Sequence, residues 1–214
     1  MRLAFWLLAV AAAPAWTQAA SRLPLPVTGP ASAQVFETTG PAAAVLTGFL
    51  VPSAGPLTSW APLFRTLGAD GRLGAEQSAG WNGPLPSRWI KVARAGSVVA
   101  GMRVLLRTSP APVQTRQFQV FWQPWSSGQP RGRVTESGVY GQAADARDTV
   151  RIVELRVPEQ AVAVGFYGEL LKGLVVQTSL LVRLADPPPQ TEPSSSTGPS
   201  APVEPVPPPL PNAP

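Results

Sequence analysis

The chain has 214 residues and a net charge of +5, and it contains neither histidine nor cysteine. These absences exclude a Ser-His-Asp triad, a thiol nucleophile, a Cys/His zinc site and a disulfide. With 44% hydrophobic and only 14% charged residues, the composition is typical of a globular protein rather than a disordered one.

The first 19 residues have the pattern of a secretory signal peptide. Arg2 precedes an apolar run at 3–13, and small residues follow up to Ala20. The run is shorter than the roughly 20 residues that span a bilayer, so we expect no transmembrane span after cleavage. An uncleaved N-terminal anchor is the alternative. We therefore expect an exported protein that is periplasmic, on the cell surface or secreted.

Residues 20–186 are long enough for one domain with its own core. Residues 20–56 are rich in Pro, Ala and Gly, so this part is expected to be less regular. It still contains two predicted strands, at 34–37 and at 44–51. Residues 60–77 give no clear pattern, because an apolar run is followed by a turn signal at 69–71.

Alternation of apolar and polar residues becomes regular after Ser87. At 98–107, the apolar residues share one face, and Arg103 and Arg107 lie on the other. At 116–123, Phe118, Val120 and Trp122 share one face of the strand, and three glutamines lie on the other face. Both segments are predicted to be half-buried strands.

Further strands are predicted at 131–139, 148–157, 161–166 and 174–184. No segment shows a helical stripe of twelve residues or more. The pattern predicts an all-β fold, an antiparallel β-sandwich or jelly roll.

Residues 90–101 and 155–165 resemble each other weakly. Each begins with an apolar residue, a basic residue and a valine at the end of a strand. A polar turn follows, and then a short run of small apolar residues that ends in glycine. We interpret them as two ordinary hairpins rather than as a duplicated unit, since repeat architectures usually need three copies.

The composition changes at residue 187. Twelve of the 28 residues at 187–214 are proline, so this tail is predicted to be disordered and extended. A solvated spacer is the favoured interpretation, and a docking peptide is the alternative.

Aromatic residues near predicted turns are the first candidates for ligand binding, because flat rings stack on sugar faces. Alternation favours the core for Trp89 and Trp122, and a binding site is the alternative. Trp125 lies beside Pro124 and the loop 126–128, and it is the first choice for a contact residue. The predicted aromatic contacts are Trp81, Trp122, Trp125 and Tyr140.

Arginines are the second set of candidates. Residues 20–185 carry 16 Lys and Arg against 9 Asp and Glu. Such a surplus favours an anionic partner, because guanidinium groups bind phosphate and carboxylate with two hydrogen bonds. Nucleic acid is not expected for an exported chain without a recognition motif. The predicted basic patch consists of Arg103, Arg107, Arg131 and Arg133.

Catalytic groups are scarce. Asp145, Asp148, Glu154 and Glu159 have no spacing that defines a carboxylate pair, and Asp145 and Asp148 fit a turn before a strand. No metal site and no cofactor are predicted. We therefore expect an exported non-catalytic module that binds an envelope or extracellular polymer, either a glycan or an anionic polymer. The alternative is a structural or assembly subunit of a secretion, conjugation or surface apparatus, with the tail as spacer or docking segment.

Overall fold

The computed structural model of the protein describes residues 19–184. Within these residues the chain forms fourteen strands in three antiparallel sheets. No helix in this part of the chain is long and apolar enough to cross a membrane. The predicted tail, and the predicted leader apart from its last residue, lie outside the described residues.

Each sheet is built on four strands in a row. The first sheet has the order β1 (Ser21–Arg22), β14 (Leu174–Leu184), β13 (Ala161–Leu171), β2 (Gln34–Thr39). The second sheet has the order β5 (Leu73–Ser78), β4 (Ala61–Leu67), β3 (Ala44–Pro52), β6 (Trp89–Ala93). The third sheet has the order β10 (Thr135–Glu136), β8 (Gln114–Ser126), β7 (Ser97–Ser109), β12 (Thr149–Arg156). Two short strands, β9 (Gln129–Pro130) and β11 (Tyr140–Gly141), also pair with β8.

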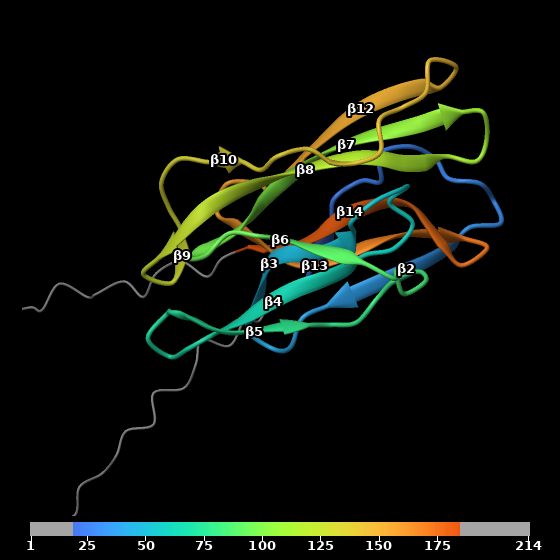
Figure 1. The fold of residues 1–214 in the computed structure, drawn as a ribbon. Coiled ribbons are helices and arrows are strands. Elements are labelled where there is room, and N and C mark those ends of the chain that lie inside the picture. The colour runs from blue at the N-terminus through green and yellow to red at the C-terminus, as the bar shows by residue number, and fades with distance from the viewer. Residues whose placement is uncertain (1–18, 185–214) are drawn as a thin grey trace, which may run out of the picture.

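The three sheets enclose a main hydrophobic core, beside a smaller buried cluster that includes Val98 and Tyr167, and the third sheet lies above the other two in Figure 1. The all-β, antiparallel part of the prediction is confirmed. The predicted sandwich or jelly roll is wrong, because those folds pack two sheets and this chain packs three. Alternation along a strand specifies which side chains face inward, but it does not specify how many sheets share them.

Four aromatic rings meet where the three sheets converge. Phe166 comes from the first sheet, Phe118 from the third, and Phe49 from the second, with Trp60 just before β4. The ring centroids of Trp60 and Phe118 lie 4.5 Å apart, and those of Phe49 and Phe166 lie 5.2 Å apart. All four side chains are buried. Tilted and edge-on contacts of this kind add to the stabilisation from burial alone.

The predicted strands at 34–37, 44–51, 98–107, 116–123, 148–157, 161–166 and 174–184 all occur, several of them longer than expected. The predicted strand at 131–139 is wrong, because only β10 at Thr135–Glu136 pairs there. Two strands of the second sheet, β4 and β5, were not predicted, and β6 was expected only as one strand of the hairpin at 90–101. Pro62 lies inside β4, and a proline weakens any strand pattern.

The two similar segments at 90–101 and 155–165 are not hairpins, which corrects that interpretation. The first connects β6 of the second sheet to β7 of the third. The second connects β12 of the third sheet to β13 of the first. Both segments are therefore crossings between neighbouring sheets, and their similar sequences belong to equivalent positions in the fold.

The short strand β11 lies very close to β8. Gly141 has a φ of +104°, and a Cβ at this position would lie 2.9 Å from Leu57 Cδ1 and would also meet the Arg116 carbonyl oxygen. The backbone conformation and the close approach both require glycine here. Gly80 has a similar φ of +92°, but a Cβ there would meet nothing within 4 Å.

We expect Gly141→Ala to destabilise the protein more than Gly80→Ala. Both variants force alanine into the left-handed region, which costs about 1 kcal/mol. Only Gly141→Ala adds a steric clash, for which about 2 kcal/mol more is expected. Urea denaturation of the two variants measures the difference, and equal losses would show that β11 is not closely packed.

Candidate functional site

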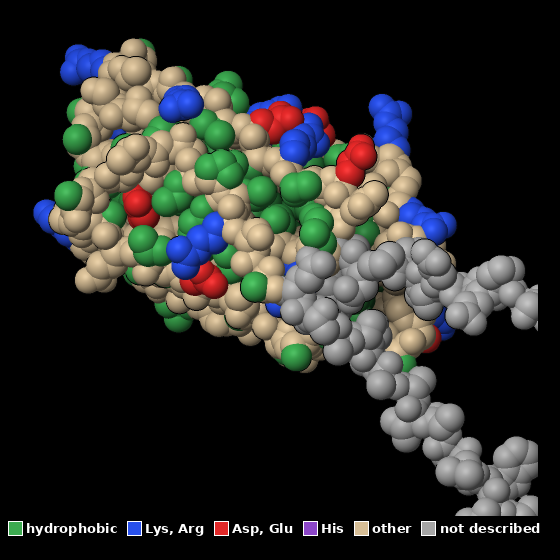
Figure 2. Space-filling model, turned by 180° about the vertical axis from the view of Figure 1, so that it is seen from behind, with side chains coloured by type: hydrophobic (Ala, Val, Ile, Leu, Met, Phe, Trp, Pro, Cys, Tyr) green, Lys and Arg blue, Asp and Glu red, His purple; other side chains and the backbone are tan. Residues whose placement is uncertain are grey.

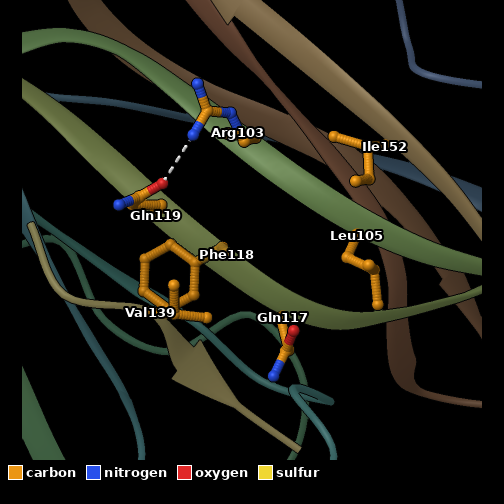
Figure 3. Close-up of a pocket in the computed structure, with 7 residues that line it drawn as sticks. All are labelled: Arg103, Leu105, Gln117, Phe118, Gln119, Val139 and Ile152. Atoms are coloured by element: carbon orange, nitrogen blue, oxygen red, sulfur yellow. Dashed lines mark hydrogen bonds between the residues drawn. The ribbon is translucent and has the colours of Figure 1, made fainter. Parts of the chain in front are cut away.

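A shallow hollow lies on the outer face of the third sheet, with a volume of about 190 Å³ (Figure 3). We call it the outer groove. Its walls come from β7, β8, β12 and the segment between β10 and β11. The lining residues are Arg103, Leu105, Gln117, Phe118, Gln119, Val139 and Ile152.

Strand register brings these side chains together in two rows. Leu105 on β7 lies opposite Ile152 on β12 and opposite Gln117 on β8. Arg103, two residues earlier, lies opposite Glu154 and Gln119. Because side chains two residues apart share a face, both rows point away from the core. The groove therefore has one apolar row beside one polar row.

A β-bulge beside the groove sets which residues point outward. Leu105 pairs with Gln117 and Leu106 pairs with Thr115, so Arg116 is the extra residue on β8. Without the extra residue, Thr115 and Gln117 would face the same side. With it, Thr115 is buried and Gln117 lies at the groove, half-exposed.

Arg103 is held in the polar row by contacts on both sides. It donates from Nη2 to Glu154 Oε2 at 2.8 Å and from Nη1 to Gln119 Oε1 at 3.0 Å. Glu136 lies 3.7 Å from Nη1, and Arg156 donates to the other oxygen of Glu154 at 2.6 Å. Two arginines and two glutamates therefore cancel one another, and the polar row has no net charge.

Hydrogen bonds from Arg156 and Arg103 hold the pKa of the Glu154 carboxyl below its ordinary value, although desolvation raises it. A general acid needs the opposite shift, towards a raised pKa. Glu154 is thus an anchor for two guanidinium groups rather than a proton donor.

Both arginines also cover an aromatic ring. The Arg156 guanidinium carbon lies 3.5 Å from the centroid of Phe121, and that of Arg103 lies 5.3 Å away. Phe121 is fully buried beneath them. Contacts between a cation and a ring face add to the ion pairs that fix the two side chains.

Val139 forms the opposite wall of the groove, and the segment that carries it is firmly attached to β8. Ser137 exchanges hydrogen bonds with the Val120 backbone, each 2.8 Å long. Gln119 Nε2 donates to the Ser137 carbonyl at 2.9 Å, and Tyr140 stacks on Phe118 with centroids 5.4 Å apart. The position of Val139 is therefore fixed without a ligand.

The bulge residue Arg116 anchors the loop that follows β11. Its Nη2 donates to Asp148 at 3.0 Å and to Asp145 at 3.3 Å. Asp148 also accepts from the Asp145 backbone N–H, and the Asp148 N–H donates back to the Asp145 carbonyl. This confirms that the two aspartates form a turn before a strand.

The structure does not bring the predicted aromatic residues together. Trp122 is a core residue with 3% exposure, so its assignment to a site is wrong, while its core interpretation is confirmed. Trp89 is 52% exposed, which corrects the expectation that it fills the core. Tyr140 lies half-buried beneath the groove wall.

Trp81 and Trp125 lie at opposite ends of the three-sheet structure. Trp81 precedes Asn82, which pairs with Trp60 where β4 begins. Trp125 donates from Nε1 to the Gly71 carbonyl at 2.8 Å, in the loop that follows β4. The length of β4 separates them by roughly 20 Å. Trp125 is also only half-exposed, because it packs on a hydrophobic cluster that includes Val98.

The predicted basic patch does not form either. Arg107 lies opposite Gln114, whereas the Arg131 backbone N–H donates to Pro124, ten residues farther along β8. At about 3.3 Å per residue, this places Arg107 and Arg131 roughly 30 Å apart. Arg131 and Arg133 are exposed, and Arg103 lies in the outer groove between acidic partners.

Charge compensation extends beyond the groove. On the face opposite to that of Figure 1, some Lys and Arg side chains lie beside Asp and Glu side chains and others stand alone, with hydrophobic side chains between them (Figure 2). Among the described residues, Arg22 also pairs with Glu37, at 2.6 Å. The surplus of arginine therefore does not make the described surface uniformly basic.

Six groove residues were missed as site candidates: Leu105, Gln117, Phe118, Gln119, Val139 and Ile152. The alternation did place Gln117 on a polar face. Nothing in the sequence indicated that β12 would lie beside β7 and bring Ile152 next to Leu105, because these residues are 47 positions apart.

The fold resembles that of jacalin-like β-prism lectins. Calsepa lectin, solved in complex with a biantennary N-glycan, has a TM-score of 0.51 at 11% identity over 78% of this chain and 98% of its own. A single-chain recombinant jacalin has a TM-score of 0.52 at 10% identity over 78% of this chain and 96% of its own. An artocarpin–mannopentose complex has a TM-score of 0.50 at 11% identity over 78% of this chain and 99% of its own. No protein-family model and no curated protein matches the chain. At such identities the likeness is one of fold.

We expect the free energy of unfolding to fall as the pH is lowered, partly through Asp148. Burial raises the pKa of Asp148, but hydrogen bonds from the Asp145 backbone and from Arg116 outweigh it and leave the pKa below the ordinary value. A lowered folded-state pKa stabilises the protein above the unfolded-state pKa, and this stabilisation is lost as the pH falls. Below about pH 5 the loss should begin.

Asp148→Asn tests this expectation. The variant should be less stable than the parent at pH 7, and the two should converge towards pH 3 in denaturation experiments. Asp145→Asn is the matched control, because Asp145 is largely exposed and lies farther from Arg116. A constant difference between Asp148→Asn and the parent at every pH would contradict the role of the Asp148 charge.

Proposed function

We propose that the chain is an exported, non-catalytic carbohydrate-binding module and that the outer groove is its sugar site. The observation that carries the proposal is a preformed hollow with an apolar row beside a charge-neutral polar row. This combination suits a sugar, which has apolar C–H faces and polar edges. Calsepa lectin and artocarpin, which share the fold, were solved with bound glycans.

The charge of the groove favours a neutral glycan over an anionic polymer. An anionic ligand requires a cation with free donors, and the guanidinium of Arg103 already donates to Glu154 and Gln119. Glu154 and Glu136 would also repel a carboxylate or phosphate placed beside Arg103. A neutral ligand meets neither obstacle. Under this proposal the leader delivers the protein to an envelope or extracellular glycan.

A single sugar in this groove binds weakly. A hexose has about a dozen heavy atoms, and at roughly 0.3 kcal/mol per atom its binding free energy is about 4 kcal/mol, which corresponds to a Kd of about 1 mM. Affinity for a polymer would come from several sugars of one chain or several copies of the protein. Screening on immobilised glycans followed by titration in NMR experiments suits this range.

We expect Ile152→Asp to weaken binding of the glycans identified in that screen by about tenfold or more, because it places a charge in the apolar row. The fold should be retained, since Ile152 is 64% exposed. Val150→Asp is the matched control. Val150 lies on the same strand at 42% exposure and does not line the groove. The glycan affinities of Val150→Asp should therefore stay within about twofold of those of the parent.

Equal affinities for Ile152→Asp and the parent would refute the groove as the sugar site. Loss of binding in Trp125→Ala, with the Ile152 variant unaffected, would move the site to the end of the prism that carries the loop 126–128.

A further inference from the structure

Two of the three polar side chains that line the outer groove hydrogen-bond within the protein. Gln119 accepts from Arg103 through Oε1 and donates to the Ser137 carbonyl through Nε2. Arg103 uses three of its five N–H donors on Glu154 and Gln119. The side chain of Gln117 makes no hydrogen bond to any of the residues 19–184 that the structure describes. One free amide therefore remains in the groove.

The surroundings of this amide are apolar. Gln117 lies opposite Leu105, which in turn lies opposite Ile152, and Val139 closes the other side of the groove (Figure 3). Ile152 and Val139 are 64% and 60% exposed, so their side chains are open to a ligand. A ligand group that fits here offers one hydrogen-bond donor and one acceptor next to a small apolar part.

We propose that the outer groove recognises the acetamido group of an N-acetylated amino sugar. The ligand carbonyl accepts from Gln117 Nε2, and the methyl group contacts Leu105, Ile152 and Val139. Because a secondary amide is trans, its N–H points away from Gln117, and a neighbouring sugar hydroxyl donates to Gln117 Oε1 instead. This inference rests on the proposed sugar-binding function and assigns the substrate class of the same site.

The size and charge of the groove agree with this assignment. Its volume of about 190 Å³ is below the roughly 300–1,000 Å³ of pockets that enclose a whole drug-sized ligand. The groove therefore takes one substituent and part of one sugar ring. A plain hydroxyl in place of the acetamido group would leave the apolar row without a partner, and an acidic sugar would lie beside Glu154 and Glu136.

Two oligosaccharides that differ only at this substituent test the proposal. Chitotriose and cellotriose share the same linkage and backbone, but only chitotriose carries acetamido groups. With the full-length protein, NMR titration should give an affinity about tenfold or more higher for chitotriose, because the hydrogen bond to the acetamido carbonyl and the methyl contact are lost in cellotriose. The resonances that shift should belong to the groove residues.

Gln117→Leu should lower the preference for chitotriose over cellotriose, because the hydrogen bond to the acetamido carbonyl is lost while the fold is retained. Gln114→Leu is the matched control, because Gln114 lies on the same strand outside the groove and is also half-exposed. Its affinity for chitotriose should stay that of the parent.

Equal binding of the two oligosaccharides, with both lost in Ile152→Asp, would overturn the acetamido assignment and leave the groove as a sugar site. The same holds if neither oligosaccharide binds but Ile152→Asp removes binding of other glycans. If the Ile152 substitution alters no glycan affinity at all, both the assignment and the proposed function are wrong.

Discussion

The contact of four aromatic rings at the centre of the prism is the constraint on which the rest of the structure depends. Phe49, Phe118 and Phe166 come from three different sheets, and Trp60 lies against the rings of all three. Since these positions must face the core, the residues next to them along each strand must face the other side of their sheet. The outer groove is thus fixed from within: Phe118 points to the core, and its neighbours Gln117 and Gln119 line the hollow above it.

The alternation of apolar and polar residues predicted this part of the molecule well. It failed where the structure depends on which strands, far apart in the sequence, lie side by side. It placed Met102, Val104 and Leu106 in the core and Arg103 outside, as the structure has them. It could not predict that the strands divide into three sheets rather than two, because the same inward faces would also suit a sandwich. It also gave no sign of the Arg116 bulge, since the extra residue depends on the strand that lies opposite.

The predicted basic patch shows the same limit for charge. The surplus of arginine suggested an anionic partner, yet Arg103 pairs with Glu154, 51 positions away, and Arg116 pairs with Asp148, 32 positions away. Net charge is a sum over the sequence, whereas the charge of a site depends on which groups the fold brings within a few ångströms. Here the fold neutralises the arginine that lines the groove, and the ligand that we propose is therefore neutral rather than anionic.

The position of the groove also separates binding from stability. Ile152 and Val139 are exposed, while Leu155 on the same strand as Ile152 is buried, so the lining can change its chemistry without opening the core. Register is the remaining constraint, because a slip of one residue would exchange the inward and outward faces of β12. The β7–β8 ladder is regular from Gly101 to Leu105, with an irregularity at each end. The two rows of the groove lie within this regular stretch, where Arg103 and Leu105 keep fixed partners on both sides.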